Sequence, residues 1–417
     1  MESCGSSELA TRHEKCDQIS VSRLSACLMR GGHALAPTPH HLSLTMQPLL
    51  IGSEIYRGST YGPKHPLAIP RVSTTLDLIR ALGWVAPERY IESPRATPED
   101  LQRFHSADYI AALMRAEATQ AVSALDRERF RIGADGNPVY REVFRRPATS
   151  AGGVLLAARL TASGGVVHVP GGGTHHGRAD RASGFCYVND AVLGLLAWRD
   201  QGLSPLLYVD IDAHHGDGVQ DAFHDDPDVF TLSVHEDGRW PFTGGLGDRA
   251  GGHAANIPVP AGFNDSEMAW VLHEAILPIA RRLRPAAIML QCGADALEED
   301  PLSKLVLSNN AHRAVVSALQ GLAPRLIVLG GGGYNPWSVA RCWAGVWGEL
   351  NGHAMPERLP AAAEQVLRGL SYHRAAGRNP PEHWFSTLAD APRPGVVRAV
   401  VRRAAASALE ALADPMA

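Results

Sequence analysis

Five short apolar runs, rich in β-branched residues and bounded by Gly or Pro, constrain the fold of this chain more than any other feature. They are GVVHVP at 165, PLLYVD at 205, DVFTLSV at 228, AAIMLQC at 286 and RLIVLG at 325. Such continuous hydrophobicity is typical of strands buried on both faces of a parallel sheet. Helical spacing of apolar residues separates the runs, at about 189–201, 265–283, 309–323 and 336–350. The alternation predicts an α/β fold, in which helices cover both faces of a central, mostly parallel sheet.

The flanking segments suggest how the chain is divided. We expect residues 1–47 to be a flexible extension, residues 48–390 a single domain that opens with a strand in PLLIG, and residues 391–417 a helical tail. Within the domain, helices are predicted at 72–82, 97–117 and 148–162. The helix at 97 has the strongest start, with Thr97 as N-cap and Pro98 in the first position.

Composition excludes several classes of protein. The 417 residues include 39 Lys and Arg against 43 Asp and Glu, a balance that argues against a nucleic-acid binder. The six cysteines form no C-x-x-C pair, which disfavours a thiolate zinc site. We find no apolar run of membrane-spanning length and no secretory start. A cytoplasmic protein with no membrane partner is therefore expected.

Polar residues gather where four of the predicted strands end. The segments are PGGGTHHGRADRASGFCYVND after 165, DIDAHHGDG after 205, CGADALEEDP after 286 and GGGGYNP after 325. In open α/β sheets, sites lie beyond the carboxyl ends of the strands. These segments are therefore expected to converge on one site.

Asp212 and His214 are two residues apart, so on an extended segment they face the same way. With Asp295 they would offer one nitrogen and two oxygen ligands and leave a position open, as in a catalytic zinc site. The simpler alternative is a structural carboxylate–histidine pair. Binuclear manganese hydrolases of the arginase type carry further carboxylates where this chain has Gly216 and Gly293, so we expect one metal ion.

Adjacent histidines follow a triple glycine, and a tyrosine follows a run of four. His175 and His176 suit general acid–base catalysis if Asp210 and Asp217 orient their rings. The alternative for either histidine is a structural role in the loop. Tyr334 is placed to donate to an oxyanion. A phosphate site is disfavoured, because GGGGY lacks the lysine of a P-loop.

Together these motifs resemble the zinc-dependent histone deacetylase superfamily, over roughly 300 residues from GPKHPLAIPR at 62 to the helix after GGGGYNPWSVARCW. The segment GPKHPLAIPRVSTTLDLIRALGW looks most like bacterial acetoin-utilisation deacetylases of the AcuC type, which are similar to class I enzymes. The resemblance implies a single-domain arginase/deacetylase fold. It also implies removal of acyl groups from lysine side chains, with acetyl-CoA synthetase as one substrate by analogy, and it allows a homo-oligomer.

The resemblance also assigns roles to residues. It gives zinc to Asp212, His214 and Asp295, acid–base chemistry to His175 and His176 with Asp210 and Asp217, and the oxyanion to Tyr334. A structural potassium ion would use Asp210, Asp212, His214, Ser233 and Val234. A weaker second potassium site would fall near Phe223, Asp226 and Val229.

For substrate binding, the resemblance points to a tunnel with a rim. Gly184 and Phe185 would line the acyl-lysine tunnel, and Gly332 would be a further substrate-binding residue. A second aromatic wall would come from Trp240 or Phe242. Two further residues match the rim carboxylate and the arginine of an internal acetate channel, namely Asp135 and Arg71.

The expected mechanism is metal-assisted amide hydrolysis. Zinc would polarise the carbonyl and lower the pKa of water, one histidine would take the water's proton, and a histidine would protonate the leaving amine. The sequence leaves open which histidine does which, and whether the metal is zinc or iron. Two other functions compete: a small-molecule amidohydrolase, for instance on acetylpolyamines, and a silent acyl-lysine binding module.

Overall fold

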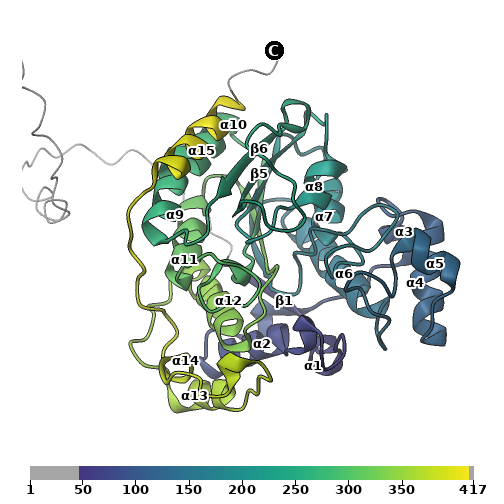
Figure 1. The fold of residues 1–417 in the computed structure, drawn as a ribbon, viewed down its shortest axis with the longest axis horizontal. Coiled ribbons are helices and arrows are strands. Elements are labelled where there is room, and N and C mark those ends of the chain that lie inside the picture. Colours follow the sequence, from purple (N-terminus) through teal and green to yellow (C-terminus); the bar gives the residue numbers. More distant parts are fainter. Residues whose placement is uncertain (1–46, 413–417) are drawn as a thin grey trace, which may run out of the picture. The chain divides into compact units, whose positions relative to one another are not determined.

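A computed structural model describes residues 47–412 of the chain (Figure 1). The extension predicted at 1–47 lies almost entirely outside the described residues. The helix predicted in the C-terminal tail is α15 (Ala399–Glu410), which packs against β6 (Ala254–Val259) and α9 (Asp265–Val271). Among the described residues, no helix combines the length and apolar character needed to cross a membrane.

Eight strands form one sheet, in the order β2-β1-β3-β8-β7-β4-β5-β6, and every neighbouring pair is parallel. Besides β6, the strands are β1 (Leu49–Gly52), β2 (Tyr90–Glu92), β3 (Gly165–Val169), β4 (Leu206–Asp210), β5 (Val229–Glu236), β7 (Ala287–Gln291) and β8 (Arg325–Leu329). The predicted parallel α/β sheet is thereby confirmed.

Helices cover both faces of the sheet (Figure 1). Residues of β4 alternate between two cores: Leu207 and Val209 face one, and Leu206 and Tyr208 face the other. Besides α9 and α15, the helices of at least four residues are α1 (Ile55–Gly58), α2 (Arg71–Ala81), α3 (Pro98–Leu101), α4 (Ala107–Thr119), α5 (Ala124–Phe130), α6 (Arg145–Leu160), α7 (Asp190–Arg199), α8 (Asp217–Ala222), α10 (Leu277–Leu283), α11 (Asn309–Leu319), α12 (Pro336–Leu350), α13 (Ala361–Arg368) and α14 (His383–Ser386), with a π-helical turn at Leu272–Ile276. Because both faces are covered, the strands read as continuous apolar runs.

The prediction of one helix at 97–117 is wrong in one respect, because the segment forms two helices. Thr97 and Asp100 form the capping box that starts α3, as the predicted N-cap implies. The hydroxyl of Ser106 then caps α4. Between them His105 turns inward, where its Nε2 accepts the backbone N–H of Asn189 at 3.0 Å. A tertiary hydrogen bond therefore breaks a segment whose local pattern is continuous.

Two edge strands and several short helices had no sequence signal. Strand β2 has three residues, and β6 contains Asn256 and Pro258, which are poor strand formers. Their pairing depends on neighbours in the sheet. The strands that had been predicted include four adjacent ones, β3, β8, β7 and β4, so their carboxyl ends lie side by side. This edge carries the polar segments.

Candidate active site and metal centre

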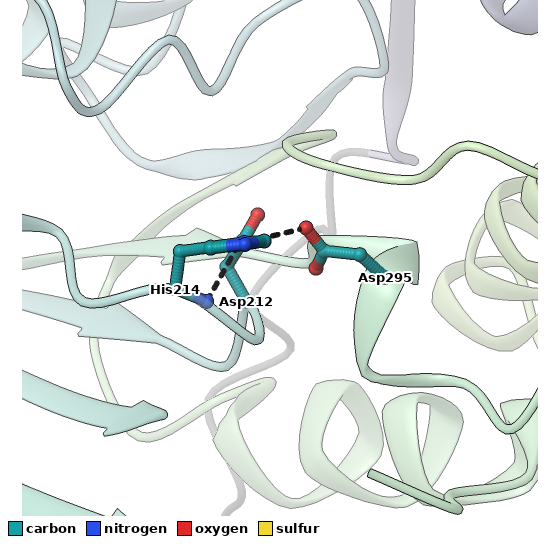
Figure 2. Close-up of side chains that lie close together, drawn as sticks. All are labelled: Asp212, His214 and Asp295. Atoms are coloured by element: carbon teal, nitrogen blue, oxygen red, sulfur yellow. Dashed lines mark hydrogen bonds and ion pairs between the residues drawn. The ribbon is translucent and has the colours of Figure 1, made fainter. Parts of the chain in front are cut away.

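Three ionisable side chains converge at the carboxyl ends of β4 and β7 (Figure 2). Asp212 and His214 follow β4, and Asp295 lies in a short 3-10 turn after β7. The Nδ1 atom of His214 lies 2.9 Å from Asp295 Oδ2 and 3.2 Å from Asp212 Oδ1. One ligand atom from each residue lies within 4.8 Å of the others. The predicted set therefore meets in space.

The chemistry of this cluster fits a metal cation. All three side chains are buried, and two carboxylates share one imidazole. Burial lowers the pKa of His214, but the carboxylates of Asp295 and Asp212 outweigh it and raise this pKa to about 10. The pocket thus attracts positive charge strongly. One nitrogen and two carboxylate oxygens are a ligand set that zinc accepts.

Neighbouring glycines leave the carboxylates room. A Cβ atom on Gly293 would lie 2.0 Å from Asp212 Oδ2, and one on Gly332 would lie 2.0 Å from Asp295 Oδ2. The backbone N–H of Gly332 also donates to Asp212 Oδ2 at 2.6 Å. Gly293 is where a binuclear site would carry a further carboxylate, and no side chain fits there. The geometry agrees with one metal ion.

Each of the adjacent histidines has its own carboxylate. His175 Nδ1 lies 2.7 Å from Asp210 Oδ2, and His176 Nδ1 lies 2.7 Å from Asp217 Oδ1. Both rings are almost fully buried, and their centroids are 3.9 Å apart. Hydrogen bonds at Nδ1 leave both Nε2 atoms for chemistry. His175 Nε2 lies 3.9 Å from Asp212 Oδ1, beside the metal cluster.

The two histidines have opposite electrostatic environments. Burial lowers the pKa of His175, but Asp210 and Asp212 raise it overall to about 9. For His176, burial and the nearby charge of His175 lower the pKa to about 4. Against burial, His176 and Arg178 hold the pKa of Asp217 at about 2. Pairs with separated pKa values are a mark of acid–base sites.

Tyr334 lines the same cavity as His175 and His176. Burial raises the pKa of Tyr334 well above its ordinary value, so its hydroxyl keeps the proton it would donate. Its backbone N–H donates to Asp300 Oδ2 at 2.6 Å. That bond ties two loops of the site together, and within its own loop Asp300 also accepts the N–H of Leu302 at 2.9 Å. Asp300 is not among the residues predicted from the sequence, although it stands in the CGADALEEDP segment that follows β7.

Another supporting residue was also missed. The hydroxyl of Tyr208 donates to Asp210 Oδ2 at 2.7 Å and lies 3.0 Å from Gln291 Oε1. The signal was available, because Tyr208 is two residues before Asp210 on β4 and therefore points to the same side.

Two connected spaces surround these groups. The inner cavity is lined by Tyr56, Arg71, Arg146, His175, Asp212 and Gly332, and the mouth by Arg131, Asp135, Arg181, Arg239, Trp240 and Leu302. Five residues line both: His176, Gly184, Phe185, His214 and Tyr334. The site is therefore reached from the mouth through a passage walled by these five residues.

Trp240, and not Phe242, lies at this passage. The Trp240 ring is 4.7 Å from the His176 ring, between centroids, whereas the Phe242 side chain is 74% exposed and does not line either space. Gly184, with φ +53°, approaches so closely that a Cβ there would lie 2.4 Å from Trp240. Phe185 stands 6.0 Å from Tyr334, between ring centroids. Of the two aromatic residues that the sequence left open, only Trp240 lines this space.

Two further predicted residues, Arg71 and Asp135, lie in different parts of the site. Arg71 donates to the carbonyls of Gly331 and Gly333 at 2.7 and 3.3 Å, inside the inner cavity. At the mouth, Asp135 Oδ2 accepts from Arg131 Nε at 2.6 Å, so the rim carboxylate already has a cationic partner. The sequence analysis did not foresee Arg131 in this position.

Several of the groups expected at the potassium sites form hydrogen bonds with other groups of the chain. Ser233 Oγ is 2.9 Å from His235 Nδ1, and Ser233 pairs with Asp210 across β4 and β5. In the second set, the carbonyl of Phe223 accepts the N–H of Asp226, and that of Asp226 accepts the N–H of Val229. Both potassium sites, with Val234 in the first, stay predictions.

Comparison with known proteins agrees with this geometry. The histone deacetylase domain family matches residues 65–350. "Putative histone deacetylase 2" of Caenorhabditis elegans is 36% identical over 313 residues, which are 73% of this chain and 61% of that protein. "Acetoin utilization protein AcuC" of Bacillus subtilis is 35% identical over 319 residues, 73% of this chain and 82% of that protein. The chain thus spans only about three fifths of the nematode relative.

Solved structures match the fold more completely. A crystal structure of an HDAC homolog from Aquifex aeolicus superposes with a TM-score of 0.83 at 36% identity, covering 87% of this chain and 99% of that one. An HDAC homolog complexed with SAHA superposes with the same TM-score at 37% identity. Both sequence and architecture lead to one family.

Proposed function

We propose that this chain, which belongs to the histone deacetylase superfamily, is a hydrolase that removes acetyl or related acyl groups from lysine side chains of proteins. One observation carries the proposal: two carboxylate-oriented histidines and Tyr334 line the same cavity as ligands of the buried Asp212–His214–Asp295 cluster. A lysine side chain is long and slender enough to present its amide there.

Asp212, His214 and Asp295 would hold the metal, for which we propose zinc. When bound, zinc supplies Lewis-acid activation of the amide carbonyl and lowers the pKa of water. The chain itself contributes burial, because the three ligands lie at the inner end of the passage, where bulk water is excluded. Low local dielectric strengthens each electrostatic contact with the reacting amide.

We assign proton transfer mainly to His176. It lines both the inner cavity and the mouth, so its Nε2 faces the place where an amide entering from the mouth would lie. Its lowered pKa keeps it neutral at pH 7, and a neutral imidazole can accept the proton of the attacking water. The same nitrogen can return that proton to the leaving lysine amine. Asp217 fixes the ring through Nδ1.

His175 and Tyr334 would stabilise negative charge. The raised pKa of His175 favours the imidazolium, which would face the developing oxyanion from the inner cavity. The protonated hydroxyl of Tyr334 would donate to the same oxygen. Phe185 and Trp240 would hold the aliphatic part of the lysine between their rings.

The test is hydrolysis of an acetyl-lysine peptide by purified wild type, Tyr334→Phe and Asp212→Ala, with metal content measured on each. We expect Tyr334→Phe to lose at least about a hundredfold in kcat and keep its metal, since it removes one oxyanion donor. Asp212→Ala should lose both metal and activity. An active Asp212→Ala protein, or a wild type that binds zinc but leaves every acyl-lysine peptide intact, would contradict the proposal.

A further inference from the structure

Arginines from three separate segments surround the mouth of the passage. Arg131 follows α5, Arg181 lies in the loop before Gly184, and Arg239 precedes Trp240. Their side chains are 43%, 47% and 23% exposed. Against these three cations, the mouth has a single acidic lining residue, Asp135. Most of the charged side chains that line the mouth are therefore guanidiniums, and each of them is paired with a carboxylate.

Each guanidinium is held in place and still has donors to offer. Glu236, which is almost fully buried, binds Nε and Nη2 of Arg239, with 2.8 Å between Nη2 and Oε1. Asp135 binds Nε and Nη2 of Arg131, and Asp180 lies 2.9 Å from Nη1 of Arg181. A guanidinium has five N–H donors. These ion pairs therefore orient the three groups without saturating them.

We propose that the mouth selects acyl-lysines whose neighbouring side chains are acidic, an inference that rests on the lysine deacylase function proposed above. Carboxylates next to the acyl-lysine would meet oriented guanidiniums, which bind planar oxyanions in a forked geometry. Lysine-rich segments and acetylated polyamines, which are cations, cannot accept hydrogen bonds from these guanidiniums with their charged groups.

Three peptides that differ only beside a central acetyl-lysine test this selection. One carries Glu on both sides, one Gln and one Lys, and kcat/KM is measured at low and at high ionic strength. We expect the Glu peptide to exceed the Lys peptide by about tenfold at low salt, the size that two exposed ion pairs would give. The ratio should shrink at high salt, because exposed charges are screened.

Arginine variants locate the effect at the mouth. Arg181→Gln and Arg239→Gln should each reduce the Glu-to-Lys ratio severalfold, and Arg181→Glu should reduce it further. Arg282→Gln is the matched control, because Arg282 is an exposed arginine near the end of α10. Helix α10 leads into the amino end of β7, whereas the mouth lies beyond the carboxyl ends of the strands. The substitution removes the same charge and should leave the ratio unchanged.

The Gln peptide separates this inference from the function on which it rests. Its turnover with equal rates for the Glu and Lys peptides would overturn the charge selection and leave the deacylase proposal standing. The same holds if Arg282→Gln changes the ratio as much as Arg181→Gln does. Loss of turnover for all three peptides would overturn both proposals.

Discussion

At the scale of single residues, Asp217 and Asp221 contact the same arginine, but only one of them contacts a histidine. Asp217 has one oxygen beside His176 Nδ1, and it also contacts the guanidinium of Arg178. Asp221, one turn further along α8, contacts the same arginine but is exposed and does not contact a histidine. The two aspartates therefore separate an effect on the histidine from an effect on the arginine.

We expect Asp217→Asn to lower kcat by at least about a hundredfold, because an amide cannot stabilise the charged imidazole or fix its tautomer as a carboxylate does. Asp221→Asn, the control, should stay within about twofold of wild type. Steady-state kinetics on an acetyl-lysine peptide, with zinc content alongside, measure both. Equal losses in the two variants would show that Asp217 acts through Arg178 rather than through His176.

Gly293 limits the metal site in a different way. A Cβ at this position would overlap Asp212 Oδ2, so Gly293→Ala should displace the carboxylate and weaken zinc binding by at least about tenfold. A competing chelator measures the affinity. Gly245→Ala is the control, because a Cβ there would have no heavy atom within 4 Å. Unchanged zinc affinity in Gly293→Ala would contradict the geometry described for Asp212.

At the scale of elements, the site depends on how helices are tied to the sheet. His105, between α3 and α4, lies 2.9 Å from the carbonyl of Arg178 through Nδ1 and accepts the N–H of Asn189 through Nε2. Asn189 caps α7 with its side chain. One neutral imidazole therefore connects the α3–α4 turn to the loop that carries His175 and His176.

This connection predicts that stability depends on pH. Burial lowers the pKa of His105 from 6.5 to about 4, and protonation of Nε2 would remove the bond to Asn189. Between these values the unfolded chain binds more protons than the folded one, so stability is full above pH 6.5 and declines as pH falls toward 4. The decline should be about 1.4 kcal/mol per pH unit for this group.

Urea unfolding at several pH values between 7.5 and 4.5 measures this slope. Wild type should lose stability steadily below pH 6.5, with His168 and His235 adding to the loss because burial lowers their pKa values in the same direction. In His105→Gln the change in the free energy of unfolding with pH should be smaller by about 1.4 kcal/mol per pH unit, which corresponds to one proton. A slope identical to that of wild type would contradict the assignment to His105.

At the scale of the whole molecule, much of the fold could be predicted from the sequence. The strands buried on both faces are continuous apolar runs, and the segments after them carry the polar groups. Part of what could not be predicted depends on contacts between distant residues, since the break before α4 follows from the His105–Asn189 bond. The pairing of Arg131 with Asp135 is local, but it depends on how the chain turns after α5.

The same limit applies to the site. Spacing alone brought Asp212 and His214 to one side, and Asp295 was predicted as the third ligand because it follows another predicted strand. Asp300 was missed, because its role is to accept a backbone N–H from a loop 34 residues away. Backbone partners leave no mark in the sequence. Likewise, the sequence pattern does not distinguish Trp240 from Phe242, and in the structure only Trp240 lines the mouth.

The most direct measurement of the central claim is a zinc titration of the metal-stripped protein, followed by turnover of an acetyl-lysine peptide. Three ligands with no room for a second metal-binding carboxylate predict that activity rises from near zero and reaches its maximum at one zinc per chain. Full activity without metal, or a maximum only at two equivalents, would contradict the account of a single-metal hydrolase site.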